Sequence, residues 1–181
     1  DVLYQWCCKW RLAINTTKTQ IIHFRNKRKP RTEFEFRYDE HVIEVVDKYK
    51  YLGVFVTEHL YYNHMAEMLT GAAGRALGSI ISKIRNIKNC GYDTFTKLFD
   101  SGVLPLLEYS SSVWGYKQYK TQDIVNRAIR YFLGLNKFAP LHAMYGDMGW
   151  KPSHIGLKLN MLRLWNKLVK MQNNRIPKIV F

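Results

Sequence analysis

The sequence predicts an α+β fold, in which a small, antiparallel, strand-rich segment is followed by an all-α helical bundle. Apolar residues alternate with a period of two over much of residues 1–57 and recur with a period near 3.6 over residues 58–181. The hydrophobic fraction is 47%, enough for a packed core in a chain of 181 residues. We therefore expect two segments, 1–57 and 58–181, with no internal repeat.

The first segment opens with a helix. Residues 2–11 place apolar side chains at helical spacing, and Asn15 suits the turn that follows. Residues 19–24 are rich in β-branched and aromatic side chains, which predicts a strand. Residues 25–31 are basic and are interrupted by Pro30, which indicates an exposed loop.

A hairpin and a further strand complete this segment. Residues 33–38 alternate charged and aromatic side chains, and residues 41–46 alternate less regularly after a two-residue turn. Residues 49–56 predict one more strand with Gly53 in its interior, where a glycine commonly marks a bulge or a close approach of backbone.

The second segment begins with an amphipathic helix from about His59 that stops near Gly91. Its expected inward stripe is Ala73, Leu77, Ile80, Ile84 and Ile87. Asp93 is a plausible N-cap for a second helix, which Pro105 kinks or ends.

Two more helices are expected. One runs from about Thr121 to Leu133 and is closed by Gly134. Residues 146–150 are predicted to be irregular, and the last helix covers about residues 153–171. Its inward side chains are Leu157, Met161, Leu164 and Leu168. Core packing is the expected role of the tryptophans: Trp6, Trp10, Trp114, Trp150 and Trp165.

The charge predicts a polyanionic partner. The net charge is +14, and nucleic acid is the leading candidate. The loop at residues 25–31 suits phosphate contact, although it also fits a nuclear-localisation patch or a solvated loop. Few cysteines and no long apolar run favour an intracellular setting, nucleus or cytoplasm, and no membrane partner.

Four segments resemble the reverse transcriptases encoded by non-LTR retrotransposons, which are RNA-directed DNA polymerases. Residues 6–19 (WCCKWRLAINTTKT) resemble motif D of that family, and residues 49–54 (YKYLGV) resemble motif E, the primer grip. Residues 98–109 and 126–134 look like the helical thumb and the region after it. The resemblance implies a C-terminal palm edge over 1–57 and a thumb-like region over 58–181.

The resemblance also implies roles for individual residues. Lys18 would act as a general acid on the pyrophosphate leaving group, unless it is a solvated turn residue. Tyr51, Leu52 and Gly53 would contact the primer, although the side chains also fit strand packing. The expected nucleic-acid contacts are Arg25, Lys27, Arg28, Lys29, Arg31, Arg75, Lys83, Arg85 and Lys88. Arg163, Lys167 and Lys170 form a similar basic face, which is also an ordinary pattern of soluble helices.

The catalytic carboxylates of that family are missing from this sequence. The family holds two Mg²⁺ ions with a Tyr-x-Asp-Asp turn and a further aspartate, which lie upstream of motif D. Here the adjacent pair Asp39-Glu40 lies in a predicted hairpin turn, and His59 and His64 do not have the spacing of helical zinc ligands. We expect no metal site in this chain, although Mg²⁺ is implied for a complete enzyme.

The sequence therefore predicts a fragment of a reverse transcriptase that binds RNA or an RNA/DNA duplex and is inactive alone. Its partner would be an upstream catalytic palm with fingers. The alternative is a retroelement-derived RNA-binding or scaffolding subunit of a larger assembly, without polymerase activity. A purely structural helical module is a third possibility, and it predicts that RNA binding is lost near physiological salt.

Overall fold

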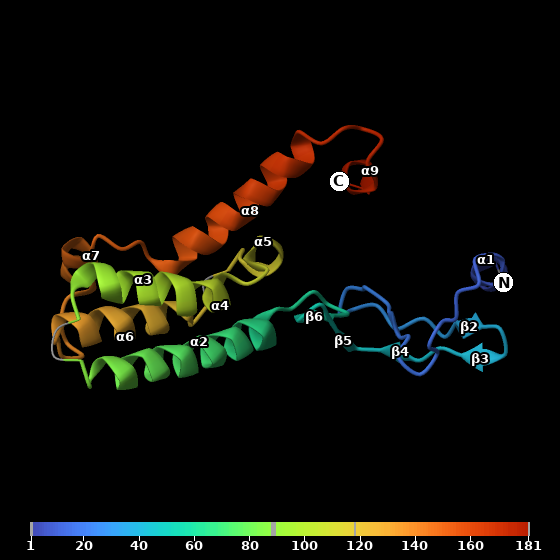
Figure 1. Ribbon diagram of the computed structural model, residues 1–181. Helices are drawn as coiled ribbons and strands as arrows, with labels where there is room; N and C mark the ends of the chain where they lie inside the picture. The colour runs from blue at the N-terminus through green and yellow to red at the C-terminus, as the bar shows by residue number, and fades with distance from the viewer. Residues whose placement is uncertain (1, 88–89, 118, 181) are drawn as a thin grey trace. The chain divides into compact units, whose positions relative to one another are not determined.

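The computed structural model describes residues 2–87, 90–117 and 119–180. Contacts divide the chain into two compact units, Asp1–His64 and Met65–Phe181. Short strands dominate the first unit and helices make up the second, as Figure 1 shows in blue to teal and in green to red. The α+β class is thereby confirmed. The boundary between the units lies slightly beyond the predicted one at 57–58.

The first unit is built from short elements. They are α1 (Val2–Lys9), β1 (Ile21–Ile22), β2 (Arg37–Tyr38), β3 (His41–Val42), β4 (Val45–Val46), β5 (Lys48–Tyr51) and β6 (Val54–Thr57). They form three two-stranded sheets, β1–β4, β2–β3 and β5–β6. β1 and β4 pair in parallel, so the antiparallel prediction is wrong for this pair. The β2–β3 hairpin lies between them in the chain and brings β4 back in the direction of β1, as a parallel pair requires.

The β2–β3 hairpin is shorter than predicted. Its ladder joins only two residue pairs, whereas the sequence pattern covers 33–38 and 41–46. Phe34 lies before the ladder and is 67% exposed. A pattern of alternating side chains specifies a strand strongly only where one face of that strand is buried. Glu33, Phe34 and Glu35 are all exposed, so this stretch has no buried face.

Residues 49–56 form a hairpin rather than one strand. β5 and β6 pair antiparallel, and Leu52-Gly53 connects them. Both turn residues have positive φ, 47° for Leu52 and 81° for Gly53, as a type I′ turn requires. Gly53 therefore lies in the turn and not inside a strand. Leucine is not a usual residue for this turn, which is why the sequence pattern did not reveal it.

Few side chains of the first unit are buried. The buried apolar residues are Cys7 on α1, Ile43 beside β3, and Tyr62. Trp6 and Trp10 are 51% and 61% exposed, so the prediction that they pack in a core is wrong. Their rings instead lie near each other at a tilt of 47°, with ring centroids 6.3 Å apart.

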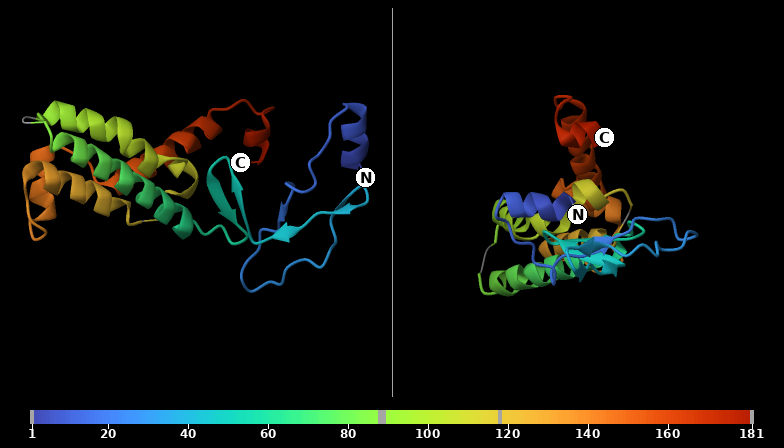
Figure 2. Two further views of the ribbon diagram at one scale, coloured as in Figure 1. Left: turned by 60° about the horizontal axis from the view of Figure 1, so that its bottom comes forward. Right: turned by 90° about the vertical axis from the view of Figure 1, so that its right-hand side faces the viewer.

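The second unit is a bundle of helices. They are α2 (Asn63–Ile84), α3 (Tyr92–Gly102), α4 (Leu104–Glu108), α5 (Ser111–Trp114), α6 (Thr121–Leu133), α7 (Leu141–Met148), α8 (Ser153–Val169) and α9 (Ile176–Val180). α2, α3 and α6 lie side by side, and the C-terminal part of α8 extends away from them (Figures 1 and 2). Their core includes Leu77, Phe95, Phe99, Val103, Leu107, Ala128, Ile129, Met144 and Met148.

The predicted stripe of α2 is largely correct. Ala73, Leu77 and Ile84 are buried in the core, and Ile80 packs against it. Ile87 is 58% exposed, because α2 ends at Ile84 and the stripe does not continue past the helix.

Glycine and proline lie at the ends of α3, α4 and α6. α3 ends at Gly102 and α4 begins at Leu104, with Pro105 in its first turn, where the missing N–H costs no helical hydrogen bond. The N-cap of α3 is Gly91 rather than Asp93, which lies in the first turn. α6 ends at Leu133, and Gly134 adopts φ 65°, which confirms the predicted cap.

α7 and α8 differ in part from the sequence pattern. α7 covers Gly146 to Met148, in a stretch that was predicted to be irregular. On α8 only Leu157 of the expected inward residues is fully buried. Trp165 is 54% exposed, so its predicted core role is wrong, whereas Trp114 is completely buried. Trp150 packs against the core, as predicted.

A partly buried polar network ties α6 to α7 and α8. The Gln122 Oε1 accepts hydrogen bonds from the backbone N–H of Ser153 at 2.8 Å and from its hydroxyl at 3.1 Å. The Tyr145 hydroxyl donates to Asn126 Oδ1 at 2.8 Å. Burial raises the pKa of Tyr145 to about 12. Gln122 thus supplies a partner for the first N–H of α8, which has no side-chain cap of its own.

Candidate nucleic-acid interface

Hydrogen bonds within the basic loop at residues 25–31 hold its turn in place. The backbone N–H of Lys29 donates to Asn26 O at 2.9 Å, and that of Arg28 donates to Asn26 Oδ1 at 3.2 Å. The Arg25 guanidinium donates to Lys29 O across the loop. Asn26 is a favourable residue for such a turn, because its side chain bonds the backbone two residues on.

Glu58 anchors this loop to the end of β6. It accepts hydrogen bonds from Arg25 Nε at 3.2 Å and Nη2 at 3.1 Å, and from Arg31 Nε at 3.0 Å. The Glu58 side chain is 12% exposed. His59 Nε2 lies 3.3 Å from Glu58, and His59 Nδ1 contacts Arg25 O at 2.9 Å. Sequence reasoning missed Glu58, because a partner more than 25 residues from both arginines has no local signal.

Arg31 and Glu58 shift each other's pKa. The hydrogen bond from Arg31, with support from Arg25, holds the pKa of Glu58 below its ordinary value of 4.5. The same hydrogen bond raises the pKa of Arg31. Arg25 and Arg31 therefore donate hydrogen bonds to Glu58, and they act as positioning residues for the loop between them.

Lys27, Arg28 and Lys29, which lie between the two arginines, are exposed cations. The Lys27 Nζ lies 5.2 Å from the ring centroid of Tyr61, an exposed aromatic that sequence reasoning also missed. A cation beside an aromatic face is a common arrangement for contact with a nucleotide strand, since the cation meets phosphate and the ring can stack on a base.

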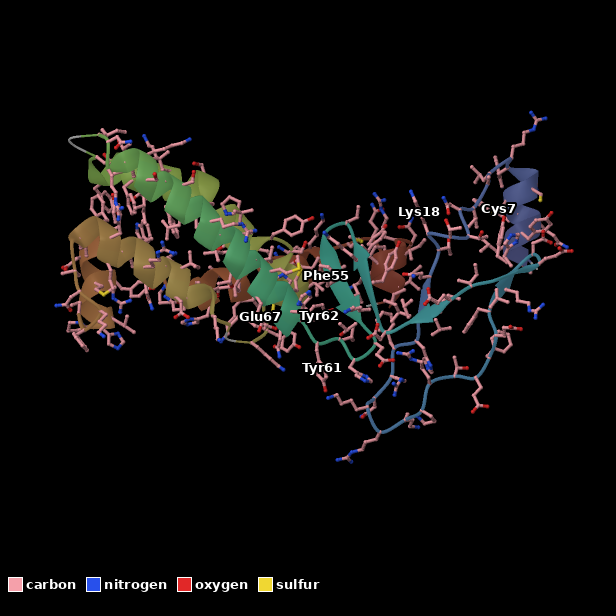
Figure 3. The ribbon with its side chains drawn as sticks, turned by 90° about the horizontal axis from the view of Figure 1, so that it is seen from below. Cys7, Lys18, Phe55, Tyr61, Tyr62 and Glu67 are labelled. Atoms are coloured by element: carbon pink, nitrogen blue, oxygen red, sulfur yellow. The ribbon has the colours of Figure 1, made fainter. Side chains whose placement is uncertain are left out.

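Lys18 lies in a compact turn apart from the loop. Asn15 organises this turn: its Oδ1 accepts from the backbone N–H of Lys18 at 3.1 Å and from the Thr17 hydroxyl at 2.6 Å. The Lys18 side chain is exposed. Figure 3 shows Lys18 well separated from Tyr61, so the turn and the Lys27 side of the loop are distinct places on the first unit.

The tip of the β5–β6 hairpin is exposed. Tyr51 is 62% and Leu52 is 74% exposed. The turn of the β5–β6 hairpin is therefore accessible to a ligand. Next to the tip, Lys50 Nζ lies 5.5 Å from the Phe55 ring centroid, which adds a cation to the same hairpin.

The second unit carries cations on two helical surfaces. Arg75 and Lys83 are exposed on α2, and Arg85 is exposed just after it. Lys88, another expected nucleic-acid contact, lies outside the described residues. On and just after α8, the exposed cations are Arg163, Lys167 and Lys170.

Metal ligands are not grouped in the described part of the chain. No cluster of three or more His, Cys, Asp or Glu side chains there could hold a metal ion. Asp39 lies in the β2–β3 turn with φ 54°. The described side chains do not offer the carboxylate ligands that hold two Mg²⁺ ions in the reverse transcriptases that this sequence resembles. No step of polymerase chemistry is therefore assigned to them. The described helices include none with the length and hydropathy of a membrane span.

Comparisons with protein-family models, with curated proteins and with solved structures gave no match for this chain.

Proposed function

We propose that this protein grips an RNA or RNA/DNA duplex and its primer end, as the palm edge and thumb of a non-LTR retrotransposon reverse transcriptase. The loop at residues 25–31 carries this proposal. Glu58 binds Arg25 and Arg31, and the three cations between them remain exposed. A preformed cationic loop loses little conformational entropy when it binds phosphates.

Further support comes from the resemblance described above. The exposed turn of the β5–β6 hairpin offers backbone and the Tyr51 ring to a primer end. The exposed cations of α2, Arg75 and Lys83, and Arg85 just after it would follow the duplex backbone, as those of a thumb do. Lys18 would deliver a proton only when another segment supplies metal-binding aspartates, so the chain alone is proposed to be inactive.

The alternative is an RNA-binding or scaffolding subunit without polymerase activity, and one observation favours a protein partner. Val2, Leu3, Trp6 and Trp10 on and beside α1 are all more than half exposed. The first unit buries few apolar side chains, so a protein surface against α1 would stabilise it. In the reverse-transcriptase proposal, the protein surface that covers α1 belongs to the catalytic palm.

Salt-dependent binding tests the proposal. The double variant Arg28→Ala/Lys29→Ala should weaken binding to an RNA/DNA duplex, and it should flatten the dependence of log K on log salt by about two units, since each lost phosphate contact removes roughly 0.9. Neither residue takes part in the Glu58 ion pairs, so the fold should be retained.

The matched control is Lys137→Ala/Lys170→Ala, which removes the same charge from exposed positions of the second unit. Long-range charge alone would change the two variants equally. Equal slopes in the two double variants would therefore remove the loop from the interface. Duplex binding that disappears at physiological salt even in the unaltered protein would favour the structural-module reading.

A further inference from the structure

Two neighbouring cavities lie in the second unit. The larger has a volume of about 390 Å³ and lies between α3, α4, α6 and the start of α8. The smaller has about 300 Å³ and lies between α5 and α8. Glu108 and Arg163 line both cavities, so these two side chains form a shared boundary. Each volume is at the lower end of the range of small-molecule sites, roughly 300–1,000 Å³.

The larger cavity suits a flat ring with polar edges. Its wall includes the Trp150 indole, which the core holds in place: the ring centroid is 4.4 Å from that of Phe99 and 6.1 Å from that of Phe95. Trp150 Nε1 and Thr96 Oγ1 are buried and have no hydrogen-bond partner within the part of the chain that the structure describes. Asp100 adds an acceptor, and burial raises its pKa. Apolar walls with donors and an acceptor match a nucleobase better than an aliphatic side chain.

The smaller cavity suits an anion. Its lining includes the hydroxyls of Ser110 and Ser112 and the cations Arg163 and Lys167. A guanidinium, an ammonium and hydroxyl donors are the usual ligands of a phosphate group in proteins. Arg163 Nη1 donates to Asn160 Oδ1 at 2.9 Å, which positions the guanidinium at the mouth of this cavity.

The boundary between the cavities carries an oriented carboxylate. Asn160 Nδ2 donates to Glu108 Oε2 at 3.1 Å and to Ser111 Oγ at 2.9 Å. The other carboxylate oxygen lies against the Cα of Gly156, where any Cβ would collide with it. A carboxylate at this place can accept hydrogen bonds from sugar hydroxyls.

We propose that the paired cavities form a binding site for a single nucleotide, with the base in the larger cavity, the phosphate at Ser110, Ser112, Arg163 and Lys167, and the ribose hydroxyls near Glu108. The nucleotide is either a free ribonucleoside monophosphate or one unpaired residue of a bound strand. The site lies wholly in the second unit and uses none of the loop residues 25–31. It therefore does not depend on the proposed duplex grip.

Calorimetric titration of the whole chain with AMP, GMP, CMP and UMP tests the site. A ligand of this size in such a pocket is expected to bind with a Kd on the order of 10–100 μM. Arg163→Glu should weaken binding at least about tenfold, because it removes a charge-assisted hydrogen bond and introduces repulsion. Lys170→Glu is the matched control: it makes the same charge change one residue beyond α8 and outside both cavities, and it should stay within about twofold.

Ribose 5-phosphate and inorganic phosphate test how much the base and the ribose contribute to binding. A single-stranded RNA hexamer tests whether the nucleotide belongs to a bound strand. Ribose 5-phosphate should bind at least about tenfold more weakly than AMP, because it lacks the base. Competition by the hexamer would identify an unpaired strand residue as the ligand, and its absence would identify a free nucleotide; both outcomes support the site.

Three results would overturn the proposal. They are the absence of saturable binding by any of the monophosphates at about 5 mM, equal affinity for AMP and ribose 5-phosphate, and equal losses in Arg163→Glu and Lys170→Glu. The variant Arg28→Ala/Lys29→Ala should keep its nucleotide binding, so failure of the duplex grip and failure of this site are distinguishable.

Discussion

A methyl group added at Gly115 tests how closely α5 and α8 approach each other. A Cβ at this position would lie 2.6 Å from Ser111 O and 3.0 Å from both the Cβ and the O of Leu157. Ser111 and Leu157 are each 1% exposed, and two of the three contacting atoms are backbone. Gly115 has φ −71°, which any L-residue adopts, so the substitution changes only steric contact.

We expect Gly115→Ala to lower the free energy of unfolding by about 2 kcal/mol, since overpacking of a filled core costs roughly 1–3 kcal/mol. For a unit of this size the midpoint temperature should fall by roughly 8 °C. Urea and thermal unfolding, followed by far-ultraviolet circular dichroism, measure both quantities.

The matched control is Gly78→Ala in the interior of α2, where an added Cβ meets nothing within 4 Å. This substitution should raise the free energy of unfolding by about 0.5–1 kcal/mol, because alanine loses less entropy than glycine in a helix. An unchanged or raised midpoint in Gly115→Ala would refute the close approach of α5 and α8. Shifts of the same sign and size in the two variants would do so as well.

Other substitutions test the first unit and the polar network. Leu52→Asn should stabilise the β5–β6 turn by about 0.5–1 kcal/mol, since asparagine adopts positive φ more readily, and it should weaken primer binding if the Leu52 side chain contacts the primer; thermal unfolding and a primer-binding assay measure the two effects. The Arg25 and Arg31 Nε–H NMR signals should shift in acid: Glu58 has a lowered pKa, so the ion pairs are complete above the ordinary value of 4.5 and are lost as pH falls through the lowered one. In Glu58→Gln these signals should not titrate. Tyr145→Phe should cost about 1 kcal/mol near neutral pH through the lost hydrogen bond. With Tyr145 present, stability should hold below pH 10.0 and fall as pH rises through about 12, because its folded pKa is raised; urea unfolding against pH should show this fall disappear in the variant.

The sequence alone was a reliable guide where the signal was local. Gly134 marked the end of α6, because a residue with positive φ after a helix is usually glycine. Pro105 marked the break between α3 and α4, because the proline ring prevents a preceding helix from continuing through it. The change of hydrophobic period predicted the strand-rich and helical halves in the right order, and the charge of +14 depends on composition only.

Local patterns were a poor guide to whether an apolar side chain is covered by another part of the fold. Trp6, Trp10 and Trp165 lie on apolar stripes, and yet all three are more than half exposed in the described chain. A stripe predicts which face is apolar, but not whether another element covers it. The short helices escaped prediction for a related reason: α5 is a single turn with too little length for periodicity.

The sequence by itself determined the α+β class, the main helices and the basic character of this protein, because these depend on residues close in the chain or on composition. Only the tertiary structure decided the parallel pairing of β1 with β4, the closure of the basic loop by Glu58, and the two cavities that share Arg163. The physical reason is chain path: these features join residues that are distant in sequence, and their geometry exists only once the intervening elements have packed.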